Sequence, residues 1–233
     1  MTPLRTSIPL SGHRARIAQY LRGIGFSFGS VAGRIIQERL SEDGTRDPVR
    51  PSLVLWACAA CGGDLSDALP VAAAFDLFDR FTLLHDELIG GAPSAQADWG
   101  VGQSLNAGDA LCALAFHTLA RDVRNPTRRL EAARLVGRAV LVAIEGATGD
   151  RSGPAALTGA AMHSGAVVAG APQSTAVAFA EAGRLLATAQ AEPEAGRALG
   201  HAWEALLAIN KHVAGGDAAA FEEVVRYVAQ RAA

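Results

Sequence analysis

The chain has 233 residues, half of them apolar, a net charge of −2 and three cysteines. This length suits one good-sized hydrophobic core, so we expect a single domain over residues 1–233, and the small net charge argues against a nucleic-acid partner. The odd cysteine count, with no secretory signal and no uninterrupted bilayer-length apolar run, predicts a soluble cytoplasmic protein without a transmembrane segment.

Helical periodicity runs through nearly the whole chain. It begins over 12–40 and stops at a polar loop that contains Pro48 and Pro51. Further helices are predicted at 52–61, 70–89, 99–121, 127–147, 155–170, 173–191, 194–213 and 217–232. Pro70 is expected in the first turn of its helix, where a missing N–H costs little. Because no β alternation is found, the predicted fold class is all-α, a single-domain antiparallel helical bundle.

Acidic residues gather on one face of the predicted helix 70–89. Asp79 and Asp86 are seven residues apart and therefore share a face, and Glu87 is next to Asp86. The other side is expected to be core, formed by Leu77, Phe78, Phe81, Leu84 and Leu88. A buried carboxylate must be protonated, paired with a cation or bound to a metal. Two interpretations remain open from these residues: a divalent-metal site, or a face that is solvated or paired with arginines such as Arg80 or Arg121.

Three stretches of the chain carry motifs of one known family. Residues 50–88, RPSLVLWACAACGGDLSDALPVAAAFDLFDRFTLLHDEL, look like a run from a GGKRxRP loop to a first aspartate-rich motif, DDxxD. Residues 99–120, WGVGQSLNAGDALCALAFHTLA, match a helix with an aGDaLlalA motif, and residues 165–190 match the helix pair before a second aspartate-rich motif. Over roughly residues 44–190 the chain resembles the trans-polyprenyl diphosphate synthase family. The resemblance implies the isoprenoid synthase fold, truncated at the C-terminus, around a deep apolar cavity.

The resemblance also implies which residues would hold a metal. Elongating members join an allylic diphosphate to isopentenyl diphosphate, using Mg²⁺ ions held by the two aspartate-rich motifs. Asp86 and Glu87 occupy the leading positions of the first motif, and Asp79 is the third candidate ligand. The motif's last acidic position falls on Gly90, so the DDxxD motif is degenerate and at most a weakly held Mg²⁺ is expected.

Substrate-binding candidates follow from the same motifs. Arg50 stands at the arginine of the RP loop, with Arg46 close by. His85 precedes the first acid and Asp109 lies in the NAGDAL stretch. His85 could equally be a packed helix residue, and Asp109 could bond to a neighbouring helix. No catalytic residue can be assigned.

Several cation and anion sites of the family have no counterpart here. Two cationic positions of the RP loop fall on Asp47 and Pro48, and the segment 90–98, GGAPSAQAD, lacks the family's Arg-Arg pair. The position of the family's second aspartate-rich motif falls on 191–196, AEPEAG, which contains no aspartate. We therefore predict a family member that does not elongate chains alone. It would bind a prenyl diphosphate or prenyl chain, or modify an active homologue, as a homodimer or heterodimer.

Two alternatives remain open. One is an active Mg²⁺-dependent prenyltransferase or class I terpene-cyclase-like enzyme acting on a prenyl diphosphate, and the other is a structural or lipid-binding helical protein. The glycines at positions 100, 102, 165, 170 and 183 are interpreted as helix-packing sites and not as a phosphate cradle, because no strand precedes them.

Overall fold

The computed structural model describes residues 10–24, 29–41, 49–90, 99–146, 152–191 and 195–210. The helices of this part are α1 (Leu10–Gly23), α2 (Val31–Ser41), α3 (Val49–Ala60), α4 (Leu65–Ile89), α6 (Val101–Asp122), α7 (Pro126–Gly146), α8 (Ser152–Ala169), α9 (Gln173–Ala191) and α10 (Ala195–Asn210). The described residues contain no strand, which confirms the all-α class.

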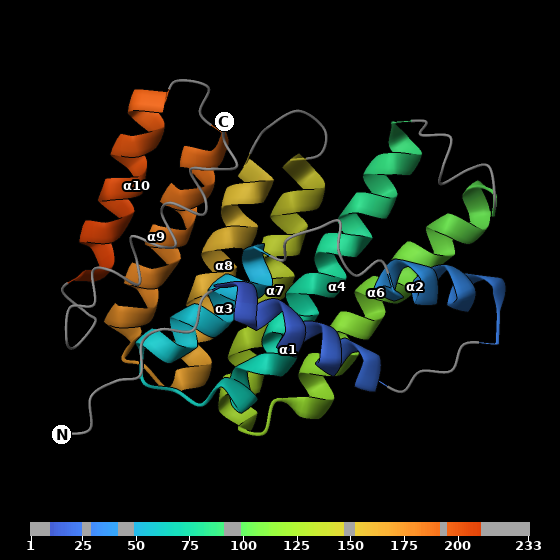
Figure 1. Ribbon diagram of the computed structural model, residues 1–233, viewed down its shortest axis with the longest axis horizontal. Helices are drawn as coiled ribbons and strands as arrows, with labels where there is room; N and C mark the ends of the chain where they lie inside the picture. Colours follow the sequence, from blue (N-terminus) through green and yellow to red (C-terminus); the bar gives the residue numbers. More distant parts are fainter. Residues whose placement is uncertain are drawn as a thin grey trace.

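The long helices stand side by side and the early helices lie across them (Figure 1). In the row, α4 packs on α6, α7 on α8, α8 on α9 and α9 on α10, while α3 bridges α4 and α8. None of the described helices is long and apolar enough to cross a bilayer.

The central helix, α4, begins five residues earlier than predicted. Asp64 caps it, because its carboxylate accepts the backbone N–H of Ser66 at 2.8 Å. Pro70 therefore lies inside the helix and not in its first turn. The predicted core face is confirmed: Leu77, Phe78, Phe81 and Leu84 are buried and Leu88 packs against them, and the Phe78 ring meets Phe116 of α6 edge to face at 5.2 Å.

Glycines set the closest helix contacts. A Cβ at Gly165 of α8 would lie 2.3 Å from the carbonyl oxygen of Val54 in α3, and one at Gly183 of α9 would lie 2.5 Å from the carbonyl oxygen of Thr158 in α8. The packing prediction is confirmed at these two positions. It is wrong at Gly102, where nothing lies within 4 Å of an added Cβ. Gly100 and Gly170 have positive φ angles of 77° and 82°, which residues with a side chain rarely adopt.

Other boundaries also differ from the sequence predictions. The segment 12–40 forms two helices, α1 and α2, and the predicted helix 217–232 lies outside the described residues. Helix α8 is covered by α3, α7 and α9, and its residues Ala161, Met162 and Ala166 are fully buried.

Candidate functional site

Four acidic residues lie between the middle of α4 and its C-terminal end. Asp76, Asp79, Asp86 and Glu87 lie within the span that ends at Ile89. Gly90, at the position of the motif's last acid, caps the helix with a φ of −73°, and its N–H donates to the carbonyl of Asp86 at 2.8 Å. Since this φ is ordinary helical geometry, the backbone does not require glycine here.

Glu87 is paired with an arginine from another helix. Arg39 of α2 places Nη2 2.6 Å from Oε2 and Nη1 3.4 Å from Oε1. The two side chains are only 18% and 20% exposed. A guanidinium fork facing both carboxylate oxygens is the strong form of this interaction.

Asp79 is also paired with an arginine from another helix, through a single nitrogen. Arg50 of α3 donates from Nη1 to its carboxylate, and the Nε of Arg50 lies 3.4 Å from the hydroxyl of Thr158 in α8. Arg50 therefore connects three helices. Its role in this structure is to neutralise Asp79, the third predicted metal ligand.

Asp76, 8% exposed, has a partner one turn away on α4. Arg80 donates from Nε to Asp76 and from Nη1 to the backbone carbonyl of Arg39. The acidic face thus receives three arginines, one each from α2, α3 and α4.

Asp86 differs from the other three acids. Its side chain is exposed and, among the residues that the structure describes, makes no ion pair or hydrogen bond. Asp86 is the predicted ligand that a cation from solution could reach most directly.

His85 packs between helices. Its ring lies 4.5 Å from that of Phe81, and a Cβ added to Gly108 of α6 would lie 2.3 Å from its Nε2. The Nε2 atom is 3.7 Å from Asp109, whose side chain is 66% exposed, and that distance is too long for a hydrogen bond. The packed-residue interpretation therefore fits His85, and Asp109 faces outward.

The donor set can be compared with what Mg²⁺ needs. This ion takes six oxygen ligands in octahedral geometry and binds through carboxylates that have free lone pairs. Within the described ranges, no three His, Cys, Asp or Glu side chains come together in a way that could hold a metal. Since Asp79 and Glu87 are already paired with arginines, the residues do not fit a resident metal.

Part of the predicted site is not described. Arg46 and the acids at the position of the second aspartate-rich motif, Glu192 and Glu194, lie outside the described residues. Sequence reasoning missed Arg39 altogether, because 48 residues separate it from Glu87 and no local pattern links them. Arg80 was named as an alternative partner, and its i, i+4 spacing from Asp76 was the available signal.

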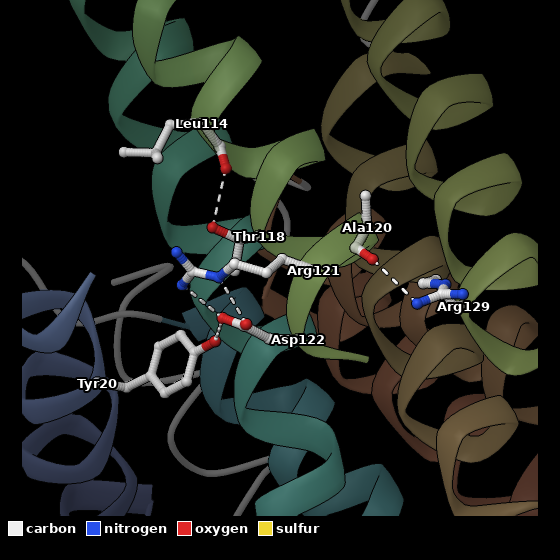
Figure 2. A network of polar contacts seen from close by, with 7 residues as sticks. All are labelled: Tyr20, Leu114, Thr118, Ala120, Arg121, Asp122 and Arg129. Carbon is white, nitrogen blue, oxygen red and sulfur yellow. Dashed lines mark hydrogen bonds and ion pairs between the residues drawn. The ribbon is translucent and has the colours of Figure 1, made fainter. Parts of the chain in front are cut away.

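A second polar cluster borders the same cleft as Ser66 and Pro70, near the N-terminal end of α4, and Figure 2 shows its side chains. There Asp122 of α6 accepts hydrogen bonds from the hydroxyl of Tyr20 in α1 and from Arg121, whose two nitrogens are each 2.7 Å away. Burial, and then the bond to Asp122, raise the pKa of Tyr20, while Arg121 lowers the pKa of Asp122. These residues line an open cleft of about 510 Å³ with Ser66, Pro70 and Arg124.

The bundle has the fold of known isoprenyl diphosphate synthases. It superimposes on an FPP/GFPP synthase from Zymomonas mobilis with a TM-score of 0.78 and 18% identity, covering 94% of this chain and 97% of that one. A mint heterotetrameric geranyl pyrophosphate synthase, studied as a deletion mutant, gives a TM-score of 0.73 and 18% identity over 98% and 99% of the two chains.

Sequence similarity identifies the family. The polyprenyl synthetase model matches residues 33–153, and the chain belongs to this family. It is 28% identical to the geranylgeranyl diphosphate synthase of Methanosarcina mazei over 162 residues, covering 59% of this chain and 50% of that protein. The chain spans between 22% and 50% of the length of the first curated relatives that it matches.

Proposed function

We propose that the chain is a polyprenyl-synthetase-like subunit in isoprenoid metabolism that does not elongate prenyl chains by itself. It would bind a prenyl chain or prenyl diphosphate, or modify the product of an active homologue with which it assembles. One observation carries this proposal: Glu87 and Asp79, two of the three candidate metal ligands, are paired with Arg39 and Arg50 of the same chain.

The reaction's electrostatics explain why this pairing matters. A diphosphate leaving group carries several negative charges that must be neutralised as its C–O bond breaks. Metal ions do this in the family, and they need carboxylates that are free to bind them. In this chain, arginines neutralise two of the candidate carboxylates, and the motif's last acidic position is occupied by Gly90.

An exposed apolar stripe supports assembly with a partner. Leu141 and Ile144 of α7 are 64% and 51% exposed and are neighbours on one face of the helix, and Leu130, 65% exposed, lies on the same face about three turns earlier. Large apolar side chains gathered on one exposed helix face are common at protein interfaces. The likeness to a chain of a heterotetrameric synthase agrees with a heteromeric partner, and a homodimer is the other arrangement that would cover the stripe.

A turnover assay tests the catalytic half of the proposal. The purified protein is incubated with Mg²⁺ and geranyl, farnesyl or geranylgeranyl diphosphate, with and without isopentenyl diphosphate, and diphosphate release is followed. No release above the buffer rate is expected. Release that disappears in Asp86→Asn would instead establish the second candidate, a non-standard prenyltransferase or class I terpene-cyclase-like enzyme, which the unpaired and exposed Asp86 favours.

A co-expression experiment tests the partner half. The chain is expressed with a full-length homologue from the same genome, and the complex is followed by size-exclusion chromatography and product length. We expect co-elution and an altered product, both lost in Leu141→Arg and kept in Val177→Arg, which changes an exposed apolar residue on α9. Monomers in every mixture would contradict the proposal.

A further inference from the structure

The contact between α2 and the end of α4 has a consequence for metal binding. We infer that Arg39 is a built-in cation that holds the Glu87 carboxylate and so keeps divalent metals from the Asp86–Glu87 pair. The inference goes beyond the proposed function, because it concerns the protein without substrate and would hold for a catalytic or a non-catalytic chain.

The geometry of the pair supports this role. Arg39 directs two nitrogens at the two carboxylate oxygens of Glu87, the closer at 2.6 Å, and about four-fifths of each side chain is buried. A metal that binds Glu87 must compete with this fork for the two carboxylate oxygens. The planar guanidinium would then lose a bidentate partner in a place where water cannot fully replace it.

The backbone of Arg39 is also fixed. Arg80 of α4 donates to the carbonyl oxygen of Arg39, in the last turn of α2, and the same guanidinium is paired with Asp76. Carbonyls at a helix C-terminus have no intrahelical partner and carry partial negative charge, so a cation is favourable there. The last turn of α2 is therefore fastened to α4 at two points, which pre-positions the Arg39 side chain.

A divalent metal ion would gain few ligands by displacing Arg39 from this site. Without Glu87, a metal at this place has Asp86, and within the described part of the chain no group of three potential ligands surrounds it. Mg²⁺ held by one or two carboxylates keeps most of its waters and binds weakly. In the competition for the Glu87 carboxylate, the guanidinium of Arg39 is therefore favoured over a weakly held metal ion.

Binding of Mn²⁺ alone, measured by the electron paramagnetic resonance of the free ion, tests the inference. Mn²⁺ prefers the same oxygen ligands as Mg²⁺. The wild type and Arg138→Met, which removes an exposed arginine from α7, are expected to show no saturable binding at millimolar Mn²⁺. Arg39→Met should gain saturable binding at least about tenfold tighter than any wild-type signal, a difference of about 1.4 kcal/mol.

The double variant Arg39→Met/Glu87→Gln should return to the wild-type level, because the freed carboxylate is the new ligand. Arg39→Gln, which keeps a hydrogen-bond donor but no charge, serves as a second test if the methionine variant does not fold by circular dichroism. Saturable wild-type binding that depends on Asp86 would overturn the inference. So would a folded Arg39 variant that binds no better than the wild type. Because no substrate is present, either failure is distinct from the turnover result.

Discussion

Two regions of the bundle place very different demands on their residues. Where α3, α8 and α9 meet, helices touch through glycine, and a single methyl group at Gly165 would lie 2.3 Å from a backbone oxygen. At the end of α4 the contacts are charged, and each acid except Asp86 has an arginine from the same chain. The packed region fixes the fold because its geometry allows no extra atoms. The charged region can exchange one cation for another, so its chemistry can change while the bundle stays the same.

The largest expected effect is in the packed region. Gly165→Ala forces α3 and α8 apart, because the new methyl group would also lie 2.9 Å from the Cβ of Ala57. We expect the free energy of unfolding to fall by about 3 kcal/mol, at the upper end for overpacked sites. Urea denaturation followed by circular dichroism measures it. Gly102→Ala is the matched control, since its surroundings are open and alanine favours a helix. Equal stability of the two variants would refute the close contact.

A buried titratable ring lies outside that packed region, on α1, which packs against α3 and α4. His13 of α1 is 1% exposed, and burial lowers its pKa from 6.5 to about 4. Since the unfolded chain binds a proton below about pH 6.5 and the folded chain only near pH 4, stability should fall as the pH falls through this window, by up to about 3 kcal/mol.

Urea denaturation at several pH values between neutrality and pH 4 checks this. His13→Phe should flatten most of the dependence, and His163, whose pKa burial also lowers, should account for a remainder in the same direction. An unchanged slope in His13→Phe would show that His13 is not the group responsible. Charge comparisons between variants are therefore best made at pH 7.5 or above, where His13 is neutral in both states.

A smaller effect is expected at the acidic end of α4. A double-mutant cycle on Arg39 and Glu87, with Met and Gln replacements, should give a coupling energy of about 1–2 kcal/mol because the pair is mostly buried. The same cycle on Arg121 and Asp122 should give less than about 1 kcal/mol, since Arg121 is 43% exposed. Equal coupling energies for the two pairs would show that the acidic end of α4 is no more strongly paired than the Arg121–Asp122 cluster.

Among the single substitutions, the smallest loss of stability is expected at the N-terminal end of α4. Tyr20→Phe removes the hydroxyl that bonds to Asp122 but leaves Arg121 in place on the same carboxylate (Figure 2). The expected loss is about 1 kcal/mol in the free energy of unfolding. If Tyr20→Phe lost more free energy of unfolding than Arg39→Met, the Tyr20–Asp122 cluster, and not the acidic end of α4, would be what holds the early helices on the bundle.

The sequence predicted the helices well and their boundaries less well. Periodicity located every described helix, and the core face of α4 was predicted correctly. The start of α4 was missed because Pro70 was assigned to a first turn, although Asp64 supplies a normal N-terminal cap earlier in the chain. The break between α1 and α2 was missed because apolar spacing continues through glycines.

The candidate site was predicted only in part, for a physical reason. Motif positions identify acids such as Asp86 and Glu87, but a motif does not show which cation lies opposite them. Arg39 and Glu87 are 48 residues apart, and Arg50 and Asp79 are 29 apart, so both pairs exist only after α2 and α3 pack on α4. Charge balance at a site is a tertiary property, and it decides whether carboxylates are available to a metal.

Anomalous diffraction tests the central claim most directly. Crystals of the wild-type protein are soaked with Mn²⁺ and inorganic diphosphate, and data are collected at the manganese absorption edge. We predict no anomalous peak within bonding distance of Asp86 or Glu87, and an Arg39 guanidinium that still contacts Glu87. A manganese ion bridging Asp86 and Glu87, with Arg39 displaced, would contradict the account.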